Sequence, residues 1–128
     1  MGYRSDVTYA ILFRDMECKR KFVALNKLHP QYHKALEECL GVDNDELAVT
    51  ADFQSVKWYD SFSDVQCHMK MLESIVDDKL DGVSAKFARA GEEGDDVEEM
   101  HFQGSDAPSA IEIGIGTYVS SNVFNNYI

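Results

Sequence analysis

The sequence predicts an α+β fold: a two-layer α/β sandwich with a mixed sheet and helices on one face. Three observations predict it. Several segments alternate apolar and polar residues as strands do, other segments between them carry apolar residues at helical spacing, and 45% hydrophobic with 27% charged residues is typical of a globular chain. A length of 128 residues suits one domain with an ordinary core, so we expect a single domain over 1–128.

The N-terminal part predicts a strand followed by two helices. Residues 6–13 (DVTYAILF) are rich in β-branched and aromatic residues, which favour a central strand. Asp15 is a suitable N-cap for a helix over about 16–28, with an expected inward stripe of Cys18, Phe22, Leu25 and His29. Pro30 interrupts that helix and suits the first turn of a second one, which Gly41 ends. Its expected inward residues are Tyr32, Leu36, Cys39 and Leu40.

A strand comes next, and its end leaves two alternatives open. Apolar residues alternate cleanly over 47–53 and continue at Val56 and Trp58 with the opposite parity. A turn near Gln54 and Ser55 would make a hairpin of 47–53 and 56–60, and the fold would then be ferredoxin-like with an added hairpin. A bulge at the same place would instead give one long bent strand.

The clearest helix begins near Ser63. This residue suits the N-cap, with Phe62 before it and Gln66 three positions on, which is a capping-box arrangement. Asp81-Gly82 is the expected end. The inward stripe expected from the spacing is Val65, Met69, Leu72, Ile75 or Val76, and Leu80.

The remaining segments predict three strands. Alternation at 83–87 and at 100–102 predicts a hairpin over 83–103 with a long acidic tip. Residues 111–119 alternate again, with glycines at 114 and 116 on one face. For 120–128, a short terminal strand and a flexible arm both stay open.

Charge narrows the classes of partner. Residues 1–40 hold seven bases and five acids, whereas 41–128 hold five bases and eighteen acids, so the net charge of −11 lies in the second part. Such a surface repels phosphate backbones, and we expect no direct nucleic-acid binding. It is suited to a basic surface on another protein.

Composition also indicates a compartment. Three cysteines without a CxxC pair favour reduced thiols. The charged N-terminus lacks the apolar core of a signal peptide, and no apolar run is long enough for a membrane helix. We therefore expect a cytoplasmic protein that does not contact a membrane.

Known chemical signatures are missing from the sequence. There is no GxSxG, Walker A or GxGxxG motif, and "IGIGT" (113–117) lies inside an alternating strand. His29 and His33 have a chelating spacing, but Pro30 between them breaks the helix geometry. The tip acids come as adjacent pairs, which a strand sends to opposite faces. We expect no catalytic residue, no metal and no cofactor.

Three stretches resemble a group of small proteins encoded by tailed phages and prophages: "MGYRSDV" (1–7), "VKWYDSFSDV" (56–65) and "FARAGEEGDDVEE" (87–99). The resemblance extends over most of the chain. It implies an origin only, a phage accessory protein working in a bacterial cytoplasm, and it carries over no catalytic or binding residues.

Two functional hypotheses follow. The first is a non-enzymatic protein that binds a host or phage protein and inhibits a host nucleic-acid enzyme or defence system. Its expected partner-binding residues are Glu92, Glu93, Asp95, Asp96, Glu98, Glu99, Trp58 and Tyr59. The second is a small-ligand-binding module or small hydrolase, with a pocket between sheet and helices lined by Tyr9, His68 or Tyr118. A homodimer formed by sheet-edge pairing is compatible with either.

Overall fold

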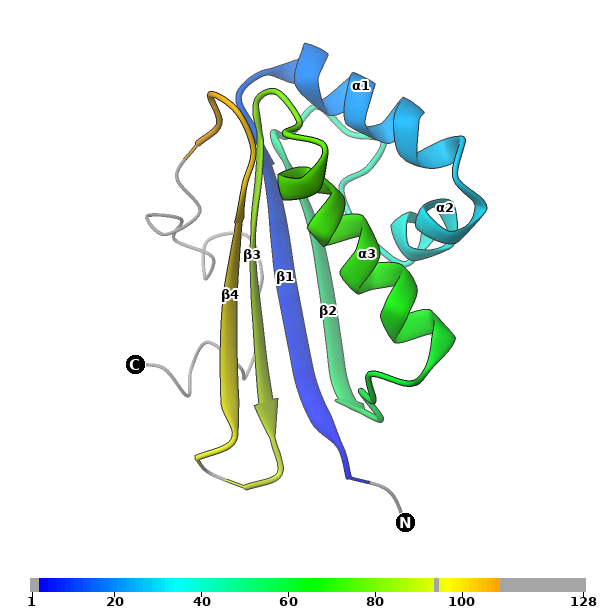
Figure 1. The fold of residues 1–128 in the computed structure, drawn as a ribbon, viewed down its shortest axis with the longest axis vertical. Helices are drawn as coiled ribbons and strands as arrows, with labels where there is room; N and C mark the ends of the chain where they lie inside the picture. The colour runs from blue at the N-terminus through cyan, green and yellow to red at the C-terminus, as the bar shows by residue number, and fades with distance from the viewer. Residues whose placement is uncertain (1–2, 94, 109–128) are drawn as a thin grey trace.

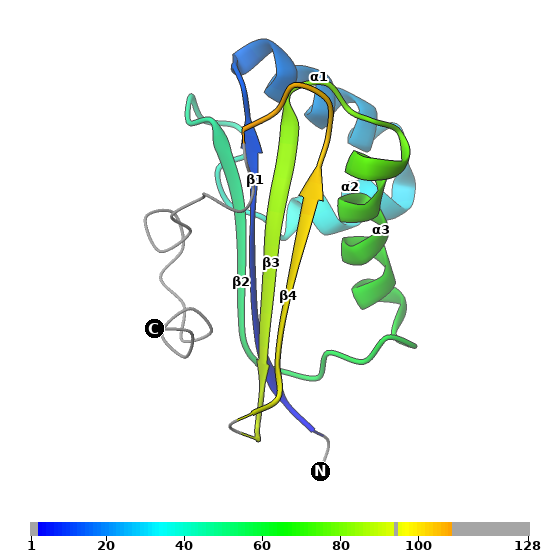
Figure 2. The ribbon, with the colours of Figure 1, turned by 60° about the vertical axis from the view of Figure 1, so that its left-hand side comes forward.

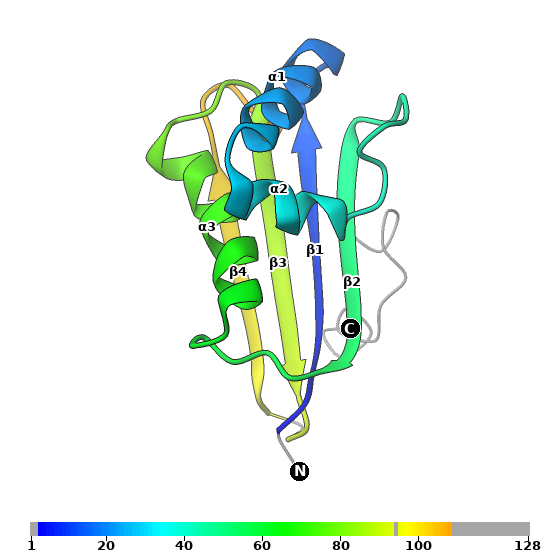
Figure 3. The ribbon, with the colours of Figure 1, turned by 90° about the vertical axis from the view of Figure 1, so that its right-hand side faces the viewer.

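The computed structural model describes residues 3–93 and 95–108. These residues form a sheet and three helices, all of which lie on one face of the sheet (Figures 1, 2 and 3). The two-layer α/β sandwich predicted from the sequence is therefore confirmed. In chain order the elements are β1 (Ser5–Phe13), α1 (Met16–Lys27), α2 (Pro30–Glu37), β2 (Ala48–Val56), α3 (Ser63–Asp77), β3 (Val83–Gly91) and β4 (Val97–Gln103).

The sheet has the strand order β2-β1-β3-β4, and each neighbouring pair is antiparallel. The expected mixed sheet does not occur among the described strands. The reason is the position of β1: β2 and β3 run in the same direction, but β1 lies between them. The connection from β2 to β3 passes β1 and contains α3, which lies over β3 and β4, so no two parallel strands become neighbours (Figure 3).

The end of β2 contains a bulge. Ser5 pairs with Val56 and Val7 pairs with Phe53, so one residue of β1 faces two residues of β2. Ser55 has a positive φ of 54°, and its backbone N–H donates to Asp6 Oδ1 at 2.8 Å. The chain thus has one strand where the ferredoxin-like alternative required two.

Helix α1 begins as predicted but faces the core differently. The Asp15 carboxylate accepts from the backbone N–H of Cys18, so it caps the helix. Cys18 and Phe22 are buried, whereas Leu25 is 50% exposed and His29 is exposed. The predicted stripe was therefore wrong in its second half, where the buried residue of α1 is Asn26.

Lys19 is the other unexpected buried residue of α1. Its ammonium group donates to the backbone carbonyls of Asn44 and Glu46 at 2.8 and 2.6 Å, and to Asn44 Oδ1 at 3.0 Å. Asn26 is satisfied similarly, because its Nδ2 donates to the carbonyl of Phe22 at 2.7 Å. Polar residues can lie in a core when acceptors are available to them.

Helix α2 ends before the last two residues of its predicted stripe. Leu36 is buried as predicted, while Leu40 is 70% exposed. Leu40 comes after the end of the helix, and its backbone N–H and C=O both bond to Thr50 of β2. Gly41 comes next with a φ of +85°, which fits the predicted stop.

Helix α3 begins one residue earlier than predicted, at Ser63 instead of after it. Phe62 occupies the N-cap position, and the capping box of Ser63 and Gln66 does not form: Gln66 donates instead to the carbonyl of Asp60 at 3.1 Å. Most of the predicted stripe faces the core: Val65, Leu72 and Ile75 are buried, and Met69 and Leu80 are partly buried. Val76, the alternative to Ile75, is exposed. His68 and Met71 are also buried, although they were not in the predicted stripe.

The hairpin of β3 and β4 is confirmed, with seven residue pairs from Ser84–Gln103 to Ala90–Val97. The predicted strand at 111–119 and the tail at 120–128 lie outside the described residues. None of the helices in the described part of the chain is long and apolar enough to cross a membrane.

Candidate functional site

The acidic hairpin tip and the Trp-Tyr segment lie at the same end of the molecule. The β3–β4 turn, the start of β1 and the segment after β2 meet there, opposite the end where α1 begins (Figure 1). The structure thus places at one end of the molecule the two groups of residues that the sequence hypothesis combined for partner binding.

Tyr3 joins these two groups. Its backbone N–H donates to the Tyr59 hydroxyl at 2.6 Å, and its own hydroxyl donates to Asp96 Oδ2 at 2.5 Å. The same hydroxyl accepts from the backbone N–H of Glu93 at 3.2 Å. The carboxylate of Asp96 is the main reason that the pKa of Tyr3 is raised. Sequence reasoning missed this link, because a tyrosine near a chain end carries no pattern.

Gly91 lets Tyr3 approach the hairpin. A Cβ added to Gly91 would collide with the Tyr3 hydroxyl and with Asp96 Oδ2. Glycine in a strand often marks such a close approach. The absence of a side chain at Gly91 therefore allows Tyr3 of the N-terminal segment to pack against the hairpin tip.

Three of the six acids in this stretch are engaged with bases. Arg89 contacts Asp96 at 2.8 Å and Glu98 at 3.4 Å, and Lys86 contacts Glu99 at 3.0 Å. The hydrogen bond from Arg89, followed by that from Tyr3, lowers the pKa of Asp96. His101 Nε2 also lies 3.0 Å from Glu99. These acids hold the hairpin in shape, which the adjacent-pair pattern did not predict.

The other three acids form the outer surface of the tip. We call Glu92, Glu93 and Asp95 the tip acids. Their side chains are exposed, and within the described residues they take part in no ion pair. Three carboxylates within four positions are therefore presented to solvent, and Arg4 is a base that lines the same shallow pocket as Glu92.

The aromatic residues beside the tip divide into a packed and an exposed group. Trp58 is partly buried against Phe53 and Phe87, with ring centroids 6.1 and 6.0 Å apart. Tyr59 is half-buried and packs edge-on against Phe62 at 5.0 Å, and Phe62 remains 39% exposed. Tyr59 connects this group to the hairpin tip, because its hydroxyl accepts from Tyr3 N–H and the Tyr3 hydroxyl accepts from Glu93 N–H.

A groove of about 370 Å³ runs between α3 and β4 on the helix side of the sheet. Trp58, Val65, Met69 and Met100 form its apolar part. Asp60, Glu73, Glu98 and Lys70 are its charged residues, so acids outnumber bases.

A buried polar cluster lies between the sheet and the helices. The Tyr9 hydroxyl is 2.7 Å from His68 Nδ1 and 3.2 Å from Cys39 Sγ, and His68 Nε2 is 3.4 Å from Glu38 Oε1. Tyr9 and His68 were predicted to share a pocket with Tyr118, which lies outside the described residues. Rings of Phe53 and Trp58 pack on His68, and both Tyr9 and His68 are buried.

Burial favours the uncharged forms of His68 and Cys39 in this cluster. Desolvation lowers the pKa of His68, although the nearby Glu38 acts in the opposite direction. Desolvation also raises the pKa of Cys39 to about 11, so its thiol is protonated at neutral pH and is a weak nucleophile. The arrangement is that of a satisfied core network rather than of an activated thiol.

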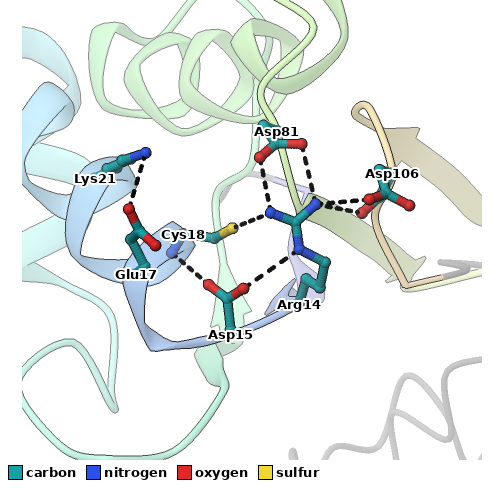
Figure 4. A network of polar contacts seen from close by, with 7 residues as sticks. All are labelled: Arg14, Asp15, Glu17, Cys18, Lys21, Asp81 and Asp106. Carbon is teal, nitrogen blue, oxygen red and sulfur yellow. Dashed lines mark hydrogen bonds and ion pairs between the residues drawn. The ribbon is translucent and has the colours of Figure 1, made fainter.

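A second polar network lies at the opposite end of the sheet (Figure 4). Arg14 binds Asp15, Asp81 and Asp106 with N–O distances of 3.3, 2.8 and 2.8 Å, and its Nη2 lies 3.4 Å from Cys18 Sγ. Arg14, at the end of β1, is thereby bonded to the cap of α1, the turn before β3 and the segment after β4. Its hydrogen bonds lower the pKa of Asp81. Here three carboxylates share one base, whereas the tip acids contact none.

Cys18, Cys39 and Cys67 are free thiols. Within residues 3–93 and 95–108, no group of three histidine, cysteine, aspartate or glutamate side chains lies close enough to hold a metal ion.

Comparisons with family models, with curated proteins and with solved structures found no match.

Proposed function

We propose that this chain is a small acidic accessory protein that acts by binding another protein, with the acidic end as its docking surface. The partner is a host or phage protein with a basic surface, and the effect is inhibition of a host nucleic-acid enzyme or a defence system. The resemblance of three stretches to phage proteins supports a phage origin and a bacterial cytoplasm as the place of action.

One observation carries the proposal. The tip acids take part in no ion pair among the described residues and are linked through Tyr3 to the partly exposed pair Tyr59 and Phe62, while acids elsewhere on the hairpin and around Arg14 contact bases. Charged rims raise association rates, and aromatic residues with a polar end are favoured anchors in interfaces. A basic nucleic-acid-binding groove offers the complementary surface.

The experiment is affinity capture from a bacterial lysate with three forms of the full chain. The test variant carries Glu92→Lys, Glu93→Lys and Asp95→Lys. The control carries Asp45→Lys, Asp77→Lys and Asp78→Lys, which are exposed acids outside the acidic end. The two variants have the same net charge, so a nonspecific effect of charge affects both.

We expect the test variant to lose captured proteins that the wild type and the control retain. Asp96 is left unchanged because Arg89 and Tyr3 depend on it. Equal capture by the test variant and the control would show that the tip is not the docking surface.

A further inference from the structure

We propose that the buried cluster of Tyr9, His68, Glu38 and Cys39 is a pH-sensitive switch that loosens the acidic end when His68 takes up a proton. The cluster has two complete hydrogen-bond arrangements, one for the neutral imidazole and one for the protonated imidazole. Contacts that lead from His68 to the hairpin tip carry the change outward. This inference rests on the proposed function, because it describes the regulation of the same docking surface.

The neutral arrangement is determined by Glu38. An ionised carboxylate only accepts, so His68 Nε2, which lies 3.4 Å from Glu38 Oε1, carries the hydrogen. Nδ1 of the neutral ring is then an acceptor, and the Tyr9 hydroxyl donates to it at 2.7 Å. The Tyr9 oxygen accepts in turn from Cys39 Sγ at 3.2 Å. Burial raises the pKa of Cys39 to about 11, so its thiol has a hydrogen to donate.

A proton on His68 Nδ1 reverses this chain of hydrogen bonds. Because Nδ1 is then a donor, the Tyr9 hydroxyl accepts from it and turns its own hydrogen toward Cys39 Sγ. The Cys39 thiol donates instead to the backbone carbonyl of Ala35, 3.4 Å away. The imidazolium keeps Glu38 as its counter-ion. Each group has a partner in both arrangements, so the cluster accepts the proton without opening the core.

The surroundings of His68 set the pH range of the switch. They are Tyr9 from β1, Phe53 from β2, Trp58 from the segment after β2, Glu38 and Cys39 from the segment after α2, and Asp64 from α3 itself. Desolvation by these neighbours lowers the pKa of His68, while the carboxylates of Glu38 and Asp64 act in the opposite direction. The proton is therefore taken up in mildly acidic solution, below the ordinary histidine value of about 6.5.

Trp58 is the first residue on the way from His68 to the tip. The two ring centroids lie 5.7 Å apart, and an imidazolium attracts an aromatic ring more strongly than a neutral imidazole does. Tyr59 follows directly in the chain, and its hydroxyl accepts from the backbone N–H of Tyr3 at 2.6 Å. A shift of Trp58 toward the charge moves Tyr59 and lengthens this bond. Because Tyr3 holds the tip through its own hydroxyl, the protonated form holds the tip less firmly.

NMR spectroscopy of the free, nitrogen-labelled full chain tests the proposal. The ring nitrogens of His68 report its tautomer and its titration midpoint, and the backbone amide of Glu93 reports the tip, because it donates to the Tyr3 hydroxyl. At about pH 7.5 we expect a hydrogen on Nε2 and none on Nδ1. As the pH falls to about 4.5, the Glu93 amide should shift with the midpoint of His68. A Glu93 amide that does not follow His68, or a His68 that stays neutral until the chain unfolds, would overturn the proposal.

Two histidine variants separate the buried cluster from the histidine of the hairpin. His68→Gln removes the titrating group, so the shift of the Glu93 amide that follows His68 should disappear. His101→Gln removes the imidazole that lies 3.0 Å from Glu99 on β4, and the shift should remain. If the shift survives in His68→Gln and is lost in His101→Gln, the tip senses His101 and the proposal is wrong.

Tyr59→Phe tests the route to the tip. Phenylalanine keeps the ring that packs against Phe62 but lacks the hydroxyl that accepts from Tyr3. We expect the indole N–H signal of Trp58, the only tryptophan, to follow His68 as before, whereas the Glu93 amide should no longer do so. An unchanged response of Glu93 would contradict the route through Tyr59.

These measurements need no partner, so they are independent of the capture experiment. If Glu93 does not follow His68 while the tip variant still loses captured proteins, the switch is wrong and the docking surface stands. If Glu93 follows His68 while the tip variant captures as the control does, the switch stands and the docking surface is wrong.

Discussion

At the scale of single residues, the candidate site depends on a contact that no sequence pattern announces. The acidic tip and the Trp-Tyr segment could each be predicted as surface features from composition. Their connection through Tyr3 could not, because the backbone N–H of Tyr3 bonds to Tyr59, 56 positions away, and its hydroxyl bonds to Asp96, 93 positions away. Only part of the buried cluster was predicted. Tyr9 and His68 were named as residues lining a pocket, whereas the network is completed by Glu38 and Cys39, which follow the last residue of α2.

Gly91→Ala is expected to destabilise the acidic end. The new methyl group would meet the Tyr3 hydroxyl and Asp96, and overpacking of this kind costs about 1–3 kcal/mol. Urea unfolding measures the change in the free energy of unfolding. In a Tyr3→Ala background the same substitution should cost less, because one of the two colliding groups is gone. An unchanged cost in that background would mean that Tyr3 does not pack on Gly91.

His68 should make stability fall as the solution becomes mildly acidic. Desolvation lowers its pKa in the folded state below the value of about 6.5 expected in the unfolded chain. The unfolded state therefore binds more protons, so the free energy of unfolding decreases as the pH falls from 7 toward 5. Chemical denaturation at several pH values measures this slope.

His68→Gln is the comparison for that slope. The variant keeps a polar side chain but cannot take up a proton, so its stability should change less between pH 7 and 5 than that of the wild type. Below about pH 4 both proteins should lose stability, since the pKa values of Asp15, Asp81 and Asp96 are lowered by their hydrogen bonds. Parallel curves from pH 7 to 5 would contradict the proposed environment of His68.

At the scale of secondary-structure elements, strand patterns were more informative than helix patterns. Alternation at 47–53, 83–87 and 100–102 identified strands that the structure contains. The inward face of α1 was harder to predict, because the burial of Lys19 depends on carbonyls from residues 44 and 46. A prediction from the spacing of apolar residues does not identify a buried lysine, because its hydrogen-bond acceptors lie in a loop that is distant in sequence. The start of α3 was wrong by one residue for a similar reason, since Gln66 found the carbonyl of Asp60 instead of completing a capping box.

Gly82→Ala should weaken the connection between α1 and the turn before β3. Gly82 has a φ of +71°, and a Cβ there would collide with Cys18 Sγ. The left-handed conformation alone costs a residue with a side chain about 1–2 kcal/mol, and the collision adds to this. Thermal unfolding should show a lower Tm. Adding Cys18→Ala should recover only the part caused by the collision; full recovery would mean that the backbone conformation carries no cost.

At the scale of the whole molecule, the two ends of the sheet differ in how their charges are balanced. At the end where α1 begins, Arg14 binds three carboxylates and joins four segments of the chain. At the acidic end, Arg89 and Lys86 contact the three inner acids, and the tip acids face solvent. Acids therefore outnumber their base partners at both ends, and the acidic end differs in that its tip acids take part in no ion pair among the described residues, which is why we propose it as the docking surface.

The proposed docking surface is tested most directly by zero-length carbodiimide cross-linking to the captured partner. Mass spectrometry then identifies the linked residues. The reagent joins carboxylates to lysine amines that are in contact. We predict links from Glu92, Glu93 and Asp95 to lysines of the partner. Links confined to exposed acids elsewhere, such as Asp45, Asp77 and Asp78, would contradict the assignment of the acidic end as the docking surface.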